Sequence, residues 1–231
     1  MWRWIAALSV SPLAAALVIG AGPRLPVPDG AADALAAFAA VLPATLGLTW
    51  AARHGGRLQA SGALVVAAAV AMAIVHLTKL PPPLVPLQVF GLTGLAHAGG
   101  DLIGRRIQHP GHVLPATWVA AAADVASVFA PSGPTGAIAK SEVALSLFAI
   151  AGGVPGTDAI TFVLGIGDLV LLALVAAAAA KFGLSLVRVA VAAFVAFSLA
   201  IAASAIWASP IPALVPFALI VPLVSAPFHE I

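Results

Sequence analysis

The chain has 231 residues, of which 62% are hydrophobic and only 8% are charged, and its formal net charge is +2. Soluble domains carry about 25% charged residues, so this composition excludes a water-soluble globular protein and favours a chain with lipid as its main solvent. The sequence has no basic run, which excludes a nucleic-acid-binding surface. The absence of cysteine excludes disulfides, iron–sulfur clusters and thiol catalysis.

Long apolar runs follow one another along the chain, separated by short polar or proline-rich loops. Because a spanning helix needs about 20 apolar residues, they predict an all-α, polytopic transmembrane helix bundle of eight or nine spans. The first run follows Arg3 and is interpreted as a retained helix rather than a signal peptide, since no clean A-x-A site comes after it. The predicted spans are 2–20, 31–52, 60–78, 84–98, 113–130, 158–180, 184–207 and 211–226.

The basic residues of the loops predict an orientation in the membrane. If the spans alternate, seven basic residues fall on one side and three on the other. The more basic side is predicted to be cytoplasmic, so both chain ends lie there and the loop between the fifth and sixth spans faces outward. We therefore expect a multi-pass protein of a bacterial or archaeal inner (plasma) membrane, and the alanine- and valine-rich composition favours that source.

Two acidic residues, Asp124 and Asp168, lie inside predicted spans, where a charge costs about 2.5 to 3.5 kcal/mol. Neither has a basic residue within a turn or two in its own span, so the two carboxyl groups are expected to face each other. Two carboxylates about 3 Å apart share a proton, which provides one base to activate water and one acid to protonate a carbonyl oxygen or leaving amine. Asp168 ends the run Gly165-Ile166-Gly167-Asp168, and its glycines are predicted to admit a neighbouring helix.

These residues resemble the GxGD intramembrane aspartyl proteases of the presenilin and signal peptide peptidase family. That family has one Asp in a transmembrane helix, a second in a GxGD motif on the next helix, and a Pro-Ala-Leu motif in the last. The corresponding residues here are Asp124, Gly165 to Asp168, and Pro212-Ala213-Leu214. Asp124-Val125, Val128-Phe129 and Ala139-Lys140-Ser141 are also similar to the signal peptide peptidase pattern. The resemblance covers about residues 120–226, nearly half of the chain.

The resemblance implies a prokaryotic intramembrane aspartyl endopeptidase that cuts transmembrane helices or signal-peptide remnants of membrane proteins. Asp124 and Asp168 would be its catalytic pair, Gly165, Gly167, Pro212, Ala213 and Leu214 would position them, and no metal or other cofactor would be needed. Residues 113–231 would form the catalytic helices, and residues 1–112 would form a scaffold of about four spans.

A substrate helix must unwind before its peptide bond is cut, and an unwound strand in lipid needs backbone partners. The stretches 143–150 and 135–139 are predicted to supply them by strand addition, with Lys140, Ser141, Val143 and Leu145 as the candidate pairing residues. A short re-entrant or helical piece is the alternative interpretation of 143–150.

Two features depart from the family pattern, since Ala123 stands where a Tyr usually precedes the first Asp and the chain has one predicted span fewer than nine. A prepilin-peptidase-like GxGD protease is an alternative, but it typically has Lys two residues after the second Asp, where this chain has Val170. A proton-coupled carrier that uses the same Asp pair as relay sites, or a catalytically silent membrane chaperone, also stays open. The sequence does not determine the oligomeric state.

Overall fold

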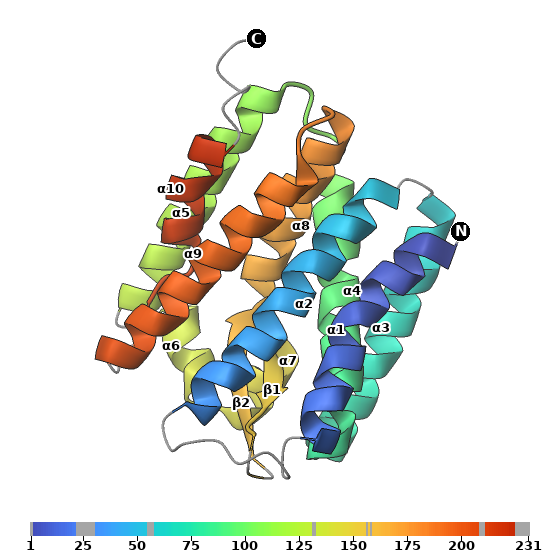
Figure 1. The fold of residues 1–231 in the computed structure, drawn as a ribbon, viewed down its shortest axis with the longest axis vertical. Helices are drawn as coiled ribbons and strands as arrows, with labels where there is room; N and C mark the ends of the chain where they lie inside the picture. Colours follow the sequence, from blue (N-terminus) through green and yellow to red (C-terminus); the bar gives the residue numbers. More distant parts are fainter. Residues whose placement is uncertain are drawn as a thin grey trace.

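The computed structural model describes residues 2–21, 31–54, 58–130, 133–155, 157, 159–207 and 211–224, and most of these are helical (Figure 1). The first half contains the helices α1 (Trp2–Ala21), α2 (Ala32–His54), α3 (Leu58–Thr78) and α4 (Val85–Gly104), and the short 3-10 turns η2 (Pro82–Leu84) and η3 (Pro110–His112). The second half contains α5 (Val113–Phe129), α6 (Pro134–Ala139), α7 (Glu142–Phe148), β1 (Ala149–Gly153), β2 (Ile160–Gly165), α8 (Ile166–Lys181), α9 (Leu186–Trp207) and α10 (Leu214–Val224).

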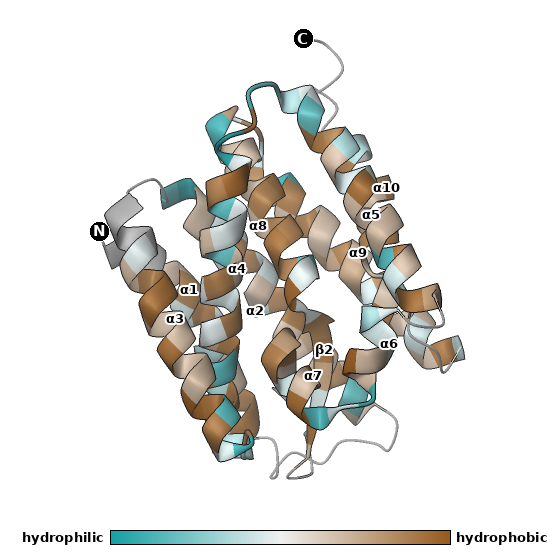
Figure 2. Ribbon diagram, turned by 180° about the vertical axis from the view of Figure 1, so that it is seen from behind, coloured by the Kyte–Doolittle hydropathy of each residue, from teal (hydrophilic) through white to brown (hydrophobic). Residues whose placement is uncertain are grey.

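The predicted mostly helical fold is confirmed. Among the described residues, three helical segments are long and apolar enough to cross a membrane: Ala32–His54, Pro110–Phe129 and Leu186–Trp207. Brown, hydrophobic stretches run along the long helices, and hydrophilic residues gather toward their ends (Figure 2). Their outward faces carry exposed large apolar side chains such as Leu46, Val119 and Leu199. That surface suits a lipid environment, because water would leave these side chains unfavourably hydrated.

Helix α8 lies at the centre of the bundle. Its side chains are buried almost continuously from Leu169 to Ala179, as expected for a helix that is apolar all round. Helices α4 and α2 pack against it, and α9 also contacts both α2 and α8 (Figure 1). One continuous hydrophobic core includes residues from both halves of the chain, from Ala7 to Val221. The boundary predicted at residue 112 thus falls just before α5, but the two halves share one core.

The contact between α4 and α8 depends on two glycines of α4. A Cβ added to Gly100 would lie 2.5 Å from the Cβ of Ala173 and 2.6 Å from the backbone nitrogen of Leu174. Gly104, one turn later, faces the backbone oxygen of Leu174 at similarly close range. This Gly-x-x-x-Gly spacing is the one that lets helix backbones approach closely in membrane proteins.

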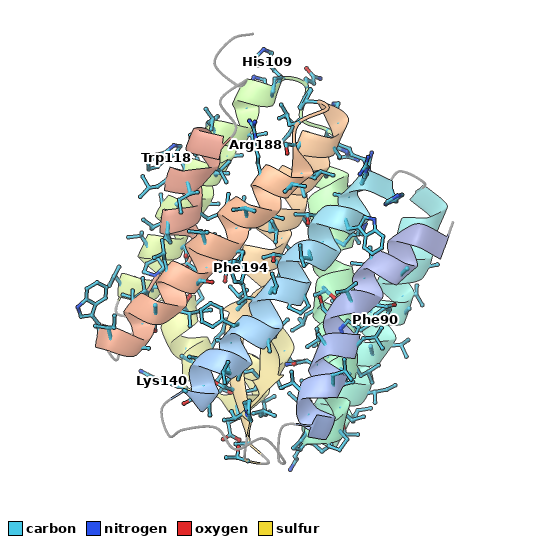
Figure 3. The ribbon with its side chains drawn as sticks, in the orientation of Figure 1. Phe90, His109, Trp118, Lys140, Arg188 and Phe194 are labelled. Atoms are coloured by element: carbon cyan, nitrogen blue, oxygen red, sulfur yellow. The ribbon has the colours of Figure 1, made fainter. Side chains whose placement is uncertain are left out.

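Charged side chains join α2, α4 and α8 at one end of the bundle. Arg105 donates from Nε to both carboxylate oxygens of Asp101, at 2.8 Å each, and from Nη2 to the carbonyl oxygen of Ala52 at 3.2 Å. The Nζ of Lys181 donates to the carbonyl oxygens of Arg105 and Ile107. Arg105 and Lys181 therefore share one end of the bundle. Arg188 and His109 lie toward the same end, and Lys140 lies at the other (Figure 3).

The sixth and eighth predicted spans begin later than the sequence suggested. The run 158–180 was predicted as one span, but residues 160–165 form β2 and the helix begins at Ile166. Ile160, Thr161 and Val163 are β-branched and favour a strand, which explains the shorter helix. The last helix begins at Leu214 rather than near residue 211; residue 211 precedes Pro212, and a residue before proline is disfavoured in helical backbone.

The stretch 143–150 was predicted either as a strand or as a short helical piece, and it divides between both. Glu142–Phe148 is helical, and Ala149 and Ile150 open β1. Ser141 begins the helix as an N-cap, since its Oγ accepts a hydrogen bond from the Ala144 N–H at 3.3 Å. Strand β1 then pairs antiparallel with β2, with Ala149 opposite Gly165 and Gly153 opposite Ile160.

The α4–α8 contact predicts that alanine substitutions at the adjacent residues Gly99 and Gly100 have opposite effects on stability. Gly100→Ala should lower the free energy of unfolding by about 1–3 kcal/mol, because the new methyl group overlaps α8 and forces the helices apart. Gly99→Ala is the matched control, since a Cβ there meets nothing within 4 Å and should only improve helix propensity. Thermal unfolding of the two purified variants in detergent measures the difference, and equal midpoints would contradict the close contact.

Candidate active site

Asp168 lies in the first turn of α8, directly after the end of β2. Its Oδ2 accepts a hydrogen bond from the backbone N–H of Gly165 at 3.0 Å. Gly165 has an extended backbone, with φ −71° and ψ 154°, so the chain turns from strand to helix at this residue. This bond holds the carboxyl group of Asp168 against the junction between β2 and α8, where the residue is partly exposed.

Asp124 lies on α5 and is held by the start of α10. Its Oδ2 accepts a hydrogen bond from the backbone N–H of Leu214 at 3.0 Å, although the two residues are 90 positions apart. The first N–H groups of a helix have no partner within the helix, so Leu214 offers a free donor. Pro212 and Leu214 are buried and Ala213 is partly buried. The Pro-Ala-Leu segment therefore lies beside Asp124.

The structure brings the two predicted carboxyl groups together. Helix α5 contacts α8, and Ala123 and Gly167, the residues directly before the two Asp residues, line the same hollow between these helices. In each carboxyl group a backbone N–H holds Oδ2, which orients both groups without neutralising either one with a basic side chain. A pair of oriented carboxyl groups is the arrangement that acid–base catalysis on a water molecule requires.

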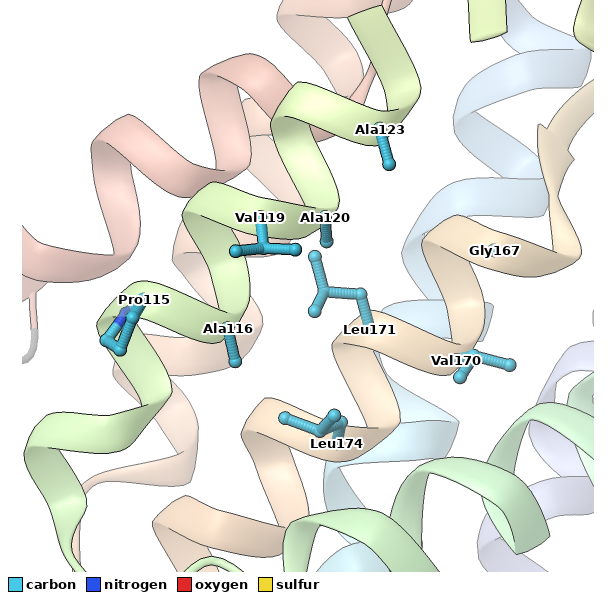
Figure 4. Close-up of a pocket in the computed structure, with 9 residues that line it drawn as sticks. All are labelled: Pro115, Ala116, Val119, Ala120, Ala123, Gly167, Val170, Leu171 and Leu174. Atoms are coloured by element: carbon cyan, nitrogen blue, oxygen red, sulfur yellow. The ribbon is translucent and has the colours of Figure 1, made fainter. Parts of the chain in front are cut away.

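An apolar cavity of about 540 Å³ lies between α5 and α8, next to the pair (Figure 4). Ala123 and Gly167, which precede the two Asp residues, both line it. The cavity is an open hollow rather than an enclosed one. Its lining consists of Pro115, Ala116, Val119, Ala120, Ala123, Gly167, Val170, Leu171 and Leu174.

The expected role of Gly167 in close helix packing is wrong. Among the described residues, no atom lies within 4 Å of a Cβ built on Gly167, and the residue is exposed to the cavity. The close approach of another helix to α8 occurs instead on the face that meets Gly100 of α4. The missing side chain at Gly167 therefore enlarges the cavity beside Asp168.

The four predicted strand-pairing residues are not in strands. Lys140 follows the last residue of α6, Ser141 caps α7, and Val143 and Leu145 lie within α7. Thr135 to Ala139 are also helical. Helical backbone groups are used within the helix, so these residues do not offer a strand edge in this structure.

The hairpin of β1 and β2, which leads directly into Asp168, is the part of the site that sequence reasoning missed. The sequence contains a signal for it, because two short runs, one with Ile150 and one with Ile160, Thr161 and Val163, flank a break at Pro155. The strong hydropathy of the neighbouring spans masked this pattern. Residues 156 and 158 of the turn lie outside the described part of the chain.

Gln88 was missed as well. This amide lies in an otherwise apolar stretch of α4, is fully buried, and bonds to the hairpin. Within the part of the chain that the structure describes, no group of three or more His, Cys, Asp or Glu residues is placed to hold a metal ion.

The proximity of the two carboxyl groups can be tested by cross-linking, because the natural chain has no cysteine. We expect an Asp124→Cys/Asp168→Cys double variant to form an intramolecular cross-link with a short thiol-specific reagent. Digestion between the two sites followed by electrophoresis measures it. Each single variant is the control, and a double variant that stays uncross-linked would contradict the arrangement.

Comparisons with models of known protein families, with curated proteins and with solved structures find no match to this chain.

Proposed function

We propose that this chain is an intramembrane aspartyl protease, resembling presenilin and signal peptide peptidase, that hydrolyses peptide bonds within transmembrane helices or signal-peptide remnants. The observation that carries the proposal is the convergence of three distant segments. Asp124 of α5 and Asp168 of α8 both follow residues that line one hollow between these two helices, and the backbone N–H of Leu214 in the Pro-Ala-Leu segment donates to Asp124. An apolar composition by itself does not require these three motif segments to lie together.

The proposed setting is a bundle of about eight membrane spans in a bacterial or archaeal inner (plasma) membrane. Besides the three helices that meet the length and composition of a span, α1, α3 and α4 have 20, 21 and 20 residues. At 1.5 Å per residue, each is about 30 Å long, which matches the apolar core of a bilayer. Helices α8 and α10 are shorter but lie alongside the others (Figure 1).

The chemistry follows from the two carboxyl groups sharing one proton. The ionised group takes a proton from a water molecule, whose oxygen attacks the carbonyl carbon of the scissile peptide bond. The protonated group gives its proton to the carbonyl oxygen, and a gem-diol forms. The carboxyl group that is now protonated then gives its proton to the leaving nitrogen, the other carboxylate takes a hydroxyl proton from the gem-diol, and the C–N bond breaks, which leaves one proton on the pair.

The substrate must present an extended backbone to this pair, and the hairpin supports that step. Strand β2 ends at Gly165, three residues before Asp168, and its residues 160–163 are partly exposed. The outer edge of β1 is already hydrogen-bonded to Gln88. A substrate strand that adds to β2 would thus run past the carboxyl pair, and apolar side chains of the substrate would enter the cavity between α5 and α8.

The first test is cleavage of a signal-peptide reporter by purified protein in liposomes. Asp124→Asn and Asp168→Asn should each lower the rate by at least about 100-fold, because general acid–base catalysis contributes about 10²–10⁴-fold. Mass spectrometry of the products measures cleavage, and Glu142→Gln, which changes an exposed carboxylate, is the matched control.

Retained cleavage in either Asp variant would refute the assignment of the catalytic pair. If the wild type neither cuts the reporter nor binds a transition-state-analogue inhibitor of aspartyl proteases, the protease proposal fails. Proton flux across the liposome membrane that depends on the same two residues would then favour a carrier.

The bond between Leu214 and Asp124 gives a second test. Leu214→Pro removes the N–H donor but places proline at the first position of α10, where helices tolerate it. We expect kcat/KM to fall about 10- to 100-fold, since a hydrogen bond to a charged group is worth about 1.5–3 kcal/mol. Leu214→Val keeps the N–H and most of the apolar side chain, and it should retain most activity. Equal losses in both variants would show that the side chain matters and the N–H does not.

A further inference from the structure

Gln88 is a buried amide that joins α4 to the hairpin. Its side chain is 0% exposed. The Nε2 group donates to the carbonyl oxygens of Ser146 and Ala149, at 2.8 and 2.9 Å, and Oε1 accepts from the backbone N–H of Ala151 at 3.1 Å. The side chain therefore makes three hydrogen bonds, all of them to backbone groups around the junction of α7 and β1.

These bonds reproduce what a neighbouring strand would do. In a parallel sheet, one residue donates its N–H to the carbonyl before a partner residue and accepts from the N–H after it. Gln88 bonds in this way to the carbonyl of Ala149 and the N–H of Ala151, on either side of Ile150. Ile150 itself pairs with Leu164 of β2. The amide thus occupies the outer edge of β1, and another strand would add to the outer edge of β2, which has no strand partner among the described residues.

The position of Gln88 also links the hairpin to the carboxyl pair by a second route. Helix α4 carries Gln88 near its start and Gly100 near its end, where it packs closely on α8. Helix α8 carries Asp168. Movement of the hairpin relative to Asp168 is therefore restrained both through the strand–helix junction at Gly165 and through α4.

We propose that Gln88 is a positioning residue of the proposed protease: it fixes the hairpin against α4, so that a substrate strand pairs with β2 in one register and one peptide bond reaches the carboxyl pair. This inference rests on the proposed function. Loss of the amide frees β1 to shift against α4, which presents neighbouring peptide bonds to Asp124 and Asp168 and spreads the cleavage positions.

The test compares the products of the signal-peptide reporter cut by wild type, Gln88→Met and Thr93→Val. Methionine keeps the length and apolar volume but removes all three bonds. Thr93 is a matched control, since it is buried on the same helix and its Oγ1 donates only to the α4 carbonyls of Val89 and Phe90. For Gln88→Met we expect kcat/KM to fall about 100-fold, as misplacement of a substrate by about 1 Å does, and the products to spread over adjacent peptide bonds.

The ratio of products separates positioning from stability. A variant that is only less stable yields fewer folded molecules but the same ratio of products. A changed ratio in Gln88→Met with an unchanged ratio in Thr93→Val supports the proposal, and an unchanged ratio in both overturns it. Hydrogen exchange gives a second readout, because the Ala151 amide should exchange faster in the variant.

If Gln88→Met does not fold, the product ratio of Gln88→Glu is measured instead, and the same outcomes support or overturn the proposal. It keeps an acceptor for the Ala151 N–H but turns a second oxygen toward the carbonyls of Ser146 and Ala149, so the ratio should also change. A wild type that neither cuts the reporter nor binds the transition-state-analogue inhibitor overturns the proposed function together with this role. Cleavage by every variant with a constant product ratio overturns the role of Gln88 alone.

Discussion

The arrangement of this site depends on the need of every buried backbone N–H for a partner. In apolar surroundings an unpaired peptide group costs several kcal/mol, and regular helices leave such groups only at their ends. Three of the backbone N–H groups around the proposed site donate to side chains from elsewhere in the chain or from a neighbouring turn. Gln88 accepts from Ala151, Asp168 accepts from Gly165 and Asp124 accepts from Leu214. Two of the three accepting side chains, Asp124 and Asp168, also form the proposed catalytic pair.

The two carboxyl groups are supported in different ways. Asp168 belongs to the central helix α8, which α2 and α4 cover on several sides, so its position follows from the core. Asp124 belongs to α5, whose side chains are mostly exposed or half-buried and whose main partner is α10. The bond to Leu214 is therefore a large part of what aligns Asp124, and the separation of the two carboxyl groups depends on how the α5–α10 pair lies against α8. The apolar cavity occupies this same boundary.

Local chemistry explains how well each part of the fold could be predicted. The runs 31–52, 113–130 and 184–207 became helices with nearly the expected bounds, because a long continuous apolar stretch pairs its backbone groups most completely as a helix, even with Pro43 inside α2. The runs 158–180 and 143–150 were harder. Both combine β-branched residues with high hydropathy. A short apolar run of this kind is compatible with a strand or a helix, and it forms a strand only where a partner strand is available for pairing. Ile160 to Gly165 and Ala149 to Gly153 are that pair of partners, and neither is recognisable alone.

By itself, the sequence determined that the chain is a mostly helical, apolar protein, and it identified Asp124 and Asp168 as carboxyl groups in unusual surroundings, because composition and the cost of burying charge are properties of single segments. Only the tertiary structure decided that Leu214 donates to Asp124 across 90 residues, that Gly100 rather than Gly167 meets a neighbouring helix, and that Gln88 closes one edge of the hairpin. These are contacts between segments far apart in the chain. They depend on which helix faces pack together, and no local pattern of residues specifies that choice.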